Sequence, residues 1–177
     1  MVTPLAAAVW GTRHHWPMPD RTTTSLPTAT ARETLGVLAG VSRGQGRVLY
    51  TSSIAGDMPA PFLAVYGASK AFDLSFAEAV RNELRDTGVS ITVLQPGPTD
   101  TNFFARAGME DTKVAAGKKD DPAEVAKQGF DALMAGKDHV VAGSMKNRLQ
   151  DAAAQVLSEP AKAAMHRRET EPGSARK

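Results

Sequence analysis

Tyr66 and Lys70, a tyrosine and a lysine four residues apart, are the residues of this chain best suited to proton transfer by their types and spacing. On a helix this spacing puts both side chains on one face, with Cβ atoms about 5–6 Å apart. A phenol ionises at about pH 10 and is a poor base at neutrality. A neighbouring ammonium favours the phenolate, so the pair could exchange a proton with an alcohol or ketone oxygen. An ordinary surface pair is the alternative interpretation.

Ser53 is a candidate for holding the substrate oxygen. It ends a short apolar run, 47–53, that is typical of a buried parallel strand. Ligands of open α/β sheets bind at the carboxyl ends of the strands. Because side chains alternate along a strand, only one of Ser52 and Ser53 can easily face such a ligand. A hydroxyl there could hold an oxygen beside the tyrosine, or Ser53 could simply satisfy nearby backbone groups.

The elements around these residues predict a parallel sheet. Apolar spacing predicts a helix over 65–86, Gly88 as its C-terminal cap, and a strand over 89–94. A strand, a helix and a strand at this spacing form a βαβ unit with a right-handed crossover. Further on, the run Asp121-Pro-Ala-Glu124 is typical of a helix N-terminus, and 138–142 suits a third short strand.

Changes in composition divide the chain into three parts. Residues 1–28 combine proline, threonine and charge without apolar periodicity, so we expect an irregular leader. Residues 29–166 form the expected folded domain, which begins with a helix over 29–41 and ends with one over 145–166. Residues 167–177 are expected to be a disordered tail.

Three motifs that follow one another along the chain resemble those of the short-chain dehydrogenase/reductase family. They are Ser52-Ser53-Ile-Ala-Gly56, Tyr66-Gly-Ala-Ser-Lys70 and Pro96-Gly-Pro-Thr-Asp-Thr101. The resemblance covers residues 29–143. It implies an α/β fold with a Rossmann-like parallel sheet and flanking helices. It also implies a nicotinamide cofactor, NAD(P)(H), and hydride transfer between that cofactor and a small alcohol or carbonyl substrate.

The resemblance also implies a role for each matching residue. Tyr66 matches the acid/base, Lys70 the residue that contacts the nicotinamide ribose, and Ser53 the residue that orients the substrate oxygen. The implied cofactor-binding residues are Tyr66, Lys70, Pro96, Gly97, Thr99 and Thr101. A proline that ends a strand, followed by a glycine that lets the backbone approach a flat ring, suits this segment.

The polar stretch after this turn is long enough to be a functional loop. We expect residues 102–119 to form a substrate lid, with Phe103, Phe104 and Met109 as candidates for its apolar wall. Ordinary core packing is the alternative for these three side chains.

The sequence lacks a glycine-rich turn that follows a strand and could cradle a pyrophosphate at a helix N-terminus. Gly44-Gln-Gly46 precedes a strand and follows a helix, so its context is wrong. We therefore expect a fold that is incomplete in its N-terminal half, and the choice between NAD and NADP stays open. An uncovered sheet edge at Val48-Leu-Tyr50 would allow pairing with another copy, hence a homo-oligomer.

Composition narrows the function classes. The 177 residues contain no cysteine, which excludes a disulfide framework, a cysteine-based zinc site and a cysteine nucleophile, and no metal site is expected. The basic excess lies near the ends of the chain, while residues 48–145 are net acidic, which argues against nucleic-acid binding. No apolar run approaches the roughly 18 residues of a membrane span, and no signal peptide is evident. The expectation is a cytoplasmic protein without a membrane partner.

Three hypotheses about function follow. The leading one is an NAD(P)-dependent oxidoreductase with Tyr66 as acid/base. The second is a truncated remnant, deficient in cofactor binding, that acts as a non-catalytic or assembly subunit, and the missing glycine-rich turn motivates it. The third is a serine hydrolase with Ser69 and Lys70 as nucleophile and base, against which stands the absence of a Gly-x-Ser-x-Gly elbow.

Overall fold

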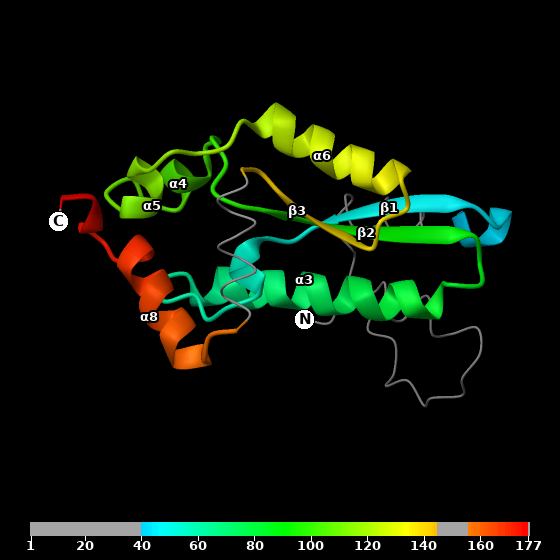
Figure 1. Ribbon diagram of the computed structural model, residues 1–177, viewed down its shortest axis with the longest axis horizontal. Helices are drawn as coiled ribbons and strands as arrows, with labels where there is room; N and C mark the ends of the chain where they lie inside the picture. The colour runs from blue at the N-terminus through cyan, green and yellow to red at the C-terminus, as the bar shows by residue number, and fades with distance from the viewer. Residues whose placement is uncertain (1–39, 145–155, 177) are drawn as a thin grey trace, which may run out of the picture.

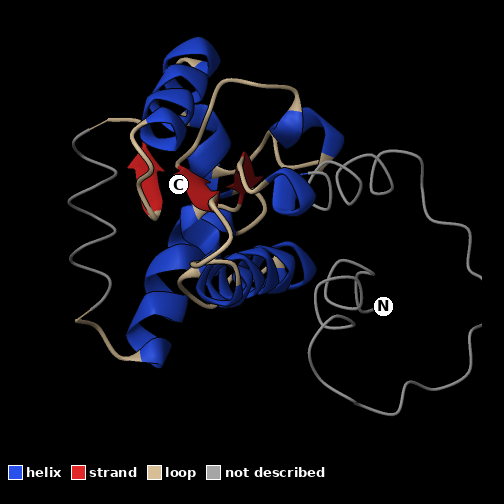
Figure 2. Cartoon of the chain, turned by 90° about the vertical axis from the view of Figure 1, so that its right-hand side faces the viewer, coloured by secondary structure: helices blue, strands red, loops and turns tan. Residues whose placement is uncertain are grey.

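A three-stranded parallel sheet with a helix on each face forms the centre of the molecule (Figure 1; Figure 2). The structure is a computed structural model that describes residues 40–144 and 156–176. The strands lie in the order β1 (Gly46–Thr51), β2 (Val89–Pro96) and β3 (His139–Ala142). The flanking helices are α3 (Ala64–Glu83) and α6 (Pro122–Met134). The predicted leader, 1–28, lies outside the described residues.

The central strand β2 is buried on both faces. Ile91 and Val93 pack with Val80 of α3 on one face. Leu94, which points to the other face, packs with Val125 of α6. A strand covered on both sides must be mainly apolar, and the fully buried polar residue Thr92 is satisfied because its hydroxyl donates to the Lys137 carbonyl oxygen at 2.7 Å. This layering confirms the predicted Rossmann-like arrangement of a parallel sheet with flanking helices.

The predicted βαβ unit is confirmed. Strand β1 pairs in parallel with β2, with Gly46 opposite Val89 and Thr51 opposite Leu94, so the two strands end at the same edge of the sheet. Gly88 is not the helix cap that the sequence predicts, because α3 ends five residues earlier. It forms the turn into β2 with a φ of 74°, a conformation that glycine adopts without a steric penalty. Among the described strands, β1 pairs only with β2.

The second half of the sheet also begins as predicted. The Asp121 carboxylate accepts hydrogen bonds from the backbone N–H groups of Ala123 and Glu124, which caps α6. The stretch expected to be a polar loop contains two one-turn helices, α4 (Phe103–Arg106) and α5 (Lys113–Ala116). Four-residue helices show no apolar repeat, so the sequence pattern could not predict them.

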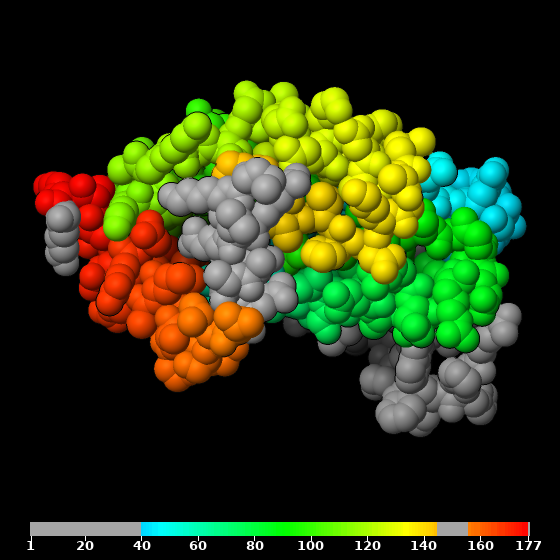
Figure 3. All heavy atoms as spheres, in the orientation of Figure 1, coloured from blue at the N-terminus to red at the C-terminus, as the bar shows by residue number. Residues whose placement is uncertain are grey.

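The C-terminal region differs from the sequence prediction. The helix expected over 145–166 lies partly outside the described residues, and the described helix, α8 (Glu159–Thr170), extends past it. The expected disordered tail is wrong over its described part, because α8 continues into it and a short 3-10 helix, η2 (Ser174–Arg176), follows. In Figure 3 this region, in orange and red, adjoins the segment around α5. We call residues 159–176 the C-terminal clasp.

Long-range hydrogen bonds explain why the clasp is ordered. The Gly173 N–H donates to the Asp111 carboxylate at 2.8 Å, and the Lys113 N–H donates to the Ser174 hydroxyl at 2.9 Å. The Ala175 N–H also donates to the Asp111 carbonyl at 3.0 Å. These partners are about sixty residues away in sequence, so a local sequence pattern gives no sign of them.

The close approach of α3 to the preceding loop at Gly67 yields a first prediction. A Cβ at this position would lie 2.6 Å from the Ala60 Cβ, far inside contact distance. We expect Gly67→Ala to lower the free energy of unfolding by about 1 kcal/mol, because the overpacking cost of about 1–3 kcal/mol exceeds the gain of about 1 kcal/mol in helix propensity. Urea denaturation measures the change.

The control for this prediction is the same substitution in an Ala60→Gly background, where the clashing methyl group is gone. There we expect Gly67→Ala to be neutral or stabilising. Equal losses in both backgrounds would contradict the clash that the structure indicates.

Candidate active site

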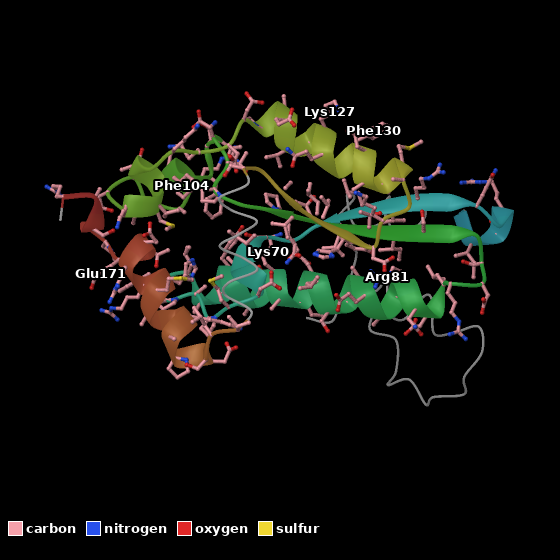
Figure 4. All side chains as sticks on the ribbon, viewed as in Figure 1. Lys70, Arg81, Phe104, Lys127, Phe130 and Glu171 are labelled. Atoms are coloured by element: carbon pink, nitrogen blue, oxygen red, sulfur yellow. The ribbon has the colours of Figure 1, made fainter. Side chains whose placement is uncertain are left out.

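The three predicted catalytic residues lie at the carboxyl edge of the sheet. Ser53 lies two residues after the end of β1, while Tyr66 and Lys70 belong to the first two turns of α3. Figure 4 shows Lys70 on the side of α3 that faces the strands. The βαβ connection therefore brings residues from the strand and the helix to one end of the fold.

The Lys70 ammonium binds two acceptors on different elements. Its Nζ donates to the Thr51 carbonyl oxygen at 2.9 Å and to Oδ2 of Asp73 at 3.0 Å. The Ser52 hydroxyl donates to the backbone carbonyl of Lys70 at 2.8 Å. The N-terminal half of α3 is thus attached to the end of β1 through both the side chain and the backbone of Lys70.

The Tyr66 ring is half-buried and packs against Phe103 of α4. The two ring centroids are 5.0 Å apart, and the ring planes are tilted by 49°. Phe104 and Met109, the other two candidates for an apolar wall, are buried at 9% and 7% exposure. Phe104 and Met109 therefore fit the interpretation of ordinary core packing. Phe103, which lies beside the tyrosine, stays a candidate for the apolar wall.

The Ser53 side chain satisfies backbone groups. Its Oγ accepts a hydrogen bond from the Ala55 N–H at 3.2 Å, which caps the 3-10 helix η1 (Ile54–Gly56), and donates to the Pro96 carbonyl oxygen at 3.4 Å. The second distance is long for a hydroxyl donor, for which about 2.7–2.8 Å is usual. The hydroxyl oxygen is therefore held as a cap, while its proton is bound only weakly.

The four remaining cofactor-binding candidates lie along the segment from β2 to α4. Pro96 ends β2, and the Gly97 N–H donates to the Ala142 carbonyl oxygen at 3.4 Å. The Thr99 hydroxyl donates to the Gly97 carbonyl oxygen at 2.9 Å. The Thr101 side chain is exposed, and its oxygen accepts from the N–H at the start of α4 at 3.3 Å. This segment leaves the sheet at the same edge as the end of β1.

Sequence reasoning missed several polar side chains at this edge. Asp73 was not singled out, although its position three residues after Lys70 on a helix is the usual spacing of an ion pair. Gln95 is 3% exposed, and its Nε2 donates to the carboxylate of Asp57, which joins the end of β2 to the segment after β1. The two residues are 38 positions apart in the sequence, so no local pattern could reveal their contact.

A cleft of about 510 Å³ lies on another face of α3, away from these groups. Ala64, Gly67, Ala68 and Ala71 of α3 line it, together with residues 56–61 and Glu159 of α8. Neither Tyr66 nor Lys70 lines this cleft. It does not contain Tyr66 or Lys70, so it is not the candidate active site.

The C-terminal clasp holds the loop that leads into α3. His166 Nδ1 lies 3.2 Å from the Pro59 carbonyl oxygen, and the Thr170 hydroxyl donates to the Pro61 carbonyl oxygen at 2.9 Å. The Arg167 guanidinium lies over the Phe62 ring, 4.9 Å from its centroid. Phe62 has a φ of 64°, which is unfavourable for a bulky residue and needs surrounding contacts to persist.

The hydrolase hypothesis is not supported by the geometry. The Ser69 hydroxyl donates to the Tyr66 carbonyl oxygen at 2.7 Å, while the Lys70 ammonium binds Thr51 and Asp73 instead.

The described residues contain no group of three or more acidic, histidine or cysteine side chains that could bind a metal ion. No helix in the described part of the chain is long and apolar enough to cross a bilayer.

Comparisons with known proteins agree with this architecture. The family described as short chain dehydrogenase matches residues 27–112. Mouse (Mus musculus) dehydrogenase/reductase SDR family member 7B is 35% identical over 101 residues, which cover 52% of this chain and 31% of that protein. Ketoacyl reductase HetN of a Nostoc species is 40% identical over 79 residues, which cover 44% of this chain and 26% of that protein.

Solved structures show the same fold. A 7beta-hydroxysteroid dehydrogenase structure superimposes with a TM-score of 0.57 at 23% identity, over 78% of this chain and 55% of that chain. A short chain dehydrogenase from Burkholderia cenocepacia gives a TM-score of 0.57 at 24% identity, over 85% of this chain and 63% of that chain.

The architecture is thus that of an α/β protein with a Rossmann-like sheet. Residues 27–112 of the chain match the short chain dehydrogenase family, and the chain is similar to members of the short-chain dehydrogenase/reductase family. It spans about a third or less of the length of the curated relatives named above.

The contact of His166 with the loop before α3 predicts a pH dependence. Burial lowers the pKa of His166 below its ordinary value of 6.5, although the Pro59 carbonyl and Glu169 act in the opposite direction. A histidine with a lowered pKa takes up a proton less readily in the folded state than in the unfolded chain. The folded state is therefore expected to lose stability as the pH falls below about 6.5.

Hydrogen exchange of the Ala60, Phe62 and Leu63 amides and the free energy of unfolding, both followed from about pH 7.5 to about pH 5, measure this effect. We expect His166→Gln, which keeps an N–H donor but does not titrate, to reduce the pH dependence. His139→Gln, at an exposed histidine, is the matched control. A pH dependence that His166→Gln and His139→Gln change equally would contradict the prediction.

Proposed function

We propose that this chain carries the catalytic portion of an NAD(P)-dependent oxidoreductase that transfers a hydride between a nicotinamide cofactor and a small alcohol or carbonyl substrate. Tyr66 exchanges the proton with the substrate oxygen. The match of residues 27–112 to the short chain dehydrogenase family supports the class of reaction. The observation that carries the proposal is the Lys70 ammonium, bound at the end of β1 one helical turn after Tyr66.

The proton transfer follows from the positions of these groups. In the reductive direction the Tyr66 hydroxyl donates its proton to the carbonyl oxygen and becomes a phenolate, one helical turn before Lys70 on α3. The apolar Phe103 ring beside the tyrosine excludes water from one side of the phenol. In the oxidative direction the same phenolate accepts the proton of the alcohol.

Ser53 contributes a hydroxyl proton to the substrate oxygen in this proposal. Its oxygen keeps the backbone bond that caps η1, while the weak 3.4 Å donation to Pro96 is exchanged for a bond to the substrate. A donor aimed at an oxygen on which negative charge develops stabilises the transition state. Ser53 therefore needs only to rotate its hydroxyl proton.

The residues at this edge fit the nicotinamide end of the cofactor. An ammonium has three donors, of which Thr51 and Asp73 occupy two, so Lys70 retains one for a ribose hydroxyl. Pro96, Gly97, Thr99 and Thr101 would hold the nicotinamide along the segment after β2. The cofactor supplies or accepts the hydride when it is bound. Related solved structures that are described as complexes contain NADP in the Burkholderia protein and NADPH in one from Sphingobium yanoikuyae.

Tyr66→Phe tests the acid/base role. The substitution removes the hydroxyl and keeps the ring that packs on Phe103. We expect turnover of the reactive substrate found in a carbonyl or alcohol screen to fall by about 10²–10⁴-fold, since general acid–base catalysis contributes about that much. Thermal unfolding is the control and is expected to change little. Unchanged turnover in the variant would rule out the assigned role.

The proposed hydride transfer requires that the chain bind a nicotinamide cofactor. The fluorescence of the reduced nicotinamide measures this binding. Titration of the chain with NADH and with NADPH is expected to give saturable enhancement with at least one of them. The two titrations also decide the phosphate preference. No change at millimolar concentrations of either cofactor would exclude independent activity of this chain and favour a non-catalytic role.

A further inference from the structure

Asp73 lies on the same helical face as the proton-transfer pair. Residues 66, 70 and 73 are separated by four and three positions, so their side chains follow one another along α3. The Asp73 carboxylate is 34% exposed and the Lys70 side chain 23% exposed. Water therefore competes with this ion pair less than with one on the open surface.

The two acceptors of Lys70 are placed so that they fix its ammonium in space. Thr51 belongs to the last position of β1, and Asp73 to the next turn of α3. A lysine side chain has a flexible four-carbon stem, and one hydrogen bond leaves much of that freedom. Bonds to a strand and to a helix together define the position of Nζ and leave one N–H group available.

We propose that Asp73 is a positioning residue for Lys70. Its carboxylate holds the ammonium against the Thr51 carbonyl oxygen, so that the remaining donor is already in place when a ligand hydroxyl arrives. This proposal rests on the function proposed above, because that function identifies the ligand as the cofactor ribose. Preorganisation of a long side chain removes part of the entropic cost of binding.

The first test measures the freedom of Lys70 without any cofactor. An amine-acylating reagent is applied to the unliganded protein, and mass spectrometry gives the labelling rate of Lys70 relative to the exposed Lys118. We expect Asp73→Leu to raise this ratio roughly two- to fivefold, the range that corresponds to a partly exposed ion pair. Asp73→Asn keeps an acceptor but loses the charge, so an intermediate value is expected.

Glu78→Gln is the matched control, since it removes one negative charge from an exposed position of the same helix. It is expected to leave Lys70 labelling unchanged. If Asp73→Leu labels Lys70 at the rate of the unsubstituted chain, the carboxylate does not hold the ammonium and the proposal is overturned. Circular dichroism of each variant shows whether the helix is retained.

The second test measures cofactor binding by nicotinamide fluorescence. We expect Asp73→Leu to weaken cofactor binding roughly two- to tenfold. Without the carboxylate, the Lys70 side chain is ordered only when the cofactor binds, and this ordering costs entropy. Asp73→Glu, which restores a carboxylate, is expected to recover part of the loss. Tighter binding by Asp73→Leu would overturn the proposal, because it would mean that the carboxylate competes with the cofactor for Lys70.

The two tests also separate failure of this proposal from failure of the proposed function. If the unsubstituted chain binds no cofactor, the proposed function fails, and with it the assignment of the ribose as ligand. The labelling experiment still decides whether Asp73 holds Lys70, because it uses the unliganded protein.

Discussion

The requirement that β2 be covered on both faces determines most of this fold. A strand with Ile91 and Val93 on one side and Leu94 on the other is stable only between two apolar layers, which α3 and α6 supply. The parallel pairing with β1 then makes both strands end at one edge. The segments that follow them, which contain Ser53 and Gly97, must therefore emerge side by side, next to the helix that carries Tyr66 and Lys70.

Lys70 links this framework to the proposed chemistry. The ammonium bond to Thr51 and the hydroxyl bond from Ser52 attach the helix to the strand before it. The same ammonium is the group that we propose binds the cofactor ribose. In the proposed function one side chain therefore serves two purposes, so loss of the positive charge at this position is expected to disturb the docking of α3 as well as cofactor binding.

The sequence predicted the strands of the sheet and the helices that cover it, but not the one-turn helices or the position of α8. The helix over 65–86 and the strand over 89–94 show repeating apolar positions, and their observed bounds differ from the prediction by a few residues at most. The one-turn helices α4 and α5 contain too few residues for such a repeat.

The candidate site divides in the same way between local and long-range information. The Tyr66–Lys70 pair and Ser53 could be recognised because their spacing is local, and their catalytic roles stay predictions. The Asp57–Gln95 hydrogen bond and the contact of α8 with Pro59 and Pro61 join segments far apart in the chain. Such contacts depend on how the elements pack in three dimensions, which neither apolar periodicity nor motif spacing records.

The C-terminal clasp lies outside the region that matches the family, which ends at residue 112. Nevertheless His166, Arg167 and Thr170 contact residues 59–62, which lie inside that region and just before the helix that carries Tyr66. Relatives with different C-terminal segments therefore need not share the geometry of this loop, even where their motifs are identical. Differences in activity among such relatives can thus originate in a C-terminal segment that contains none of the family motifs.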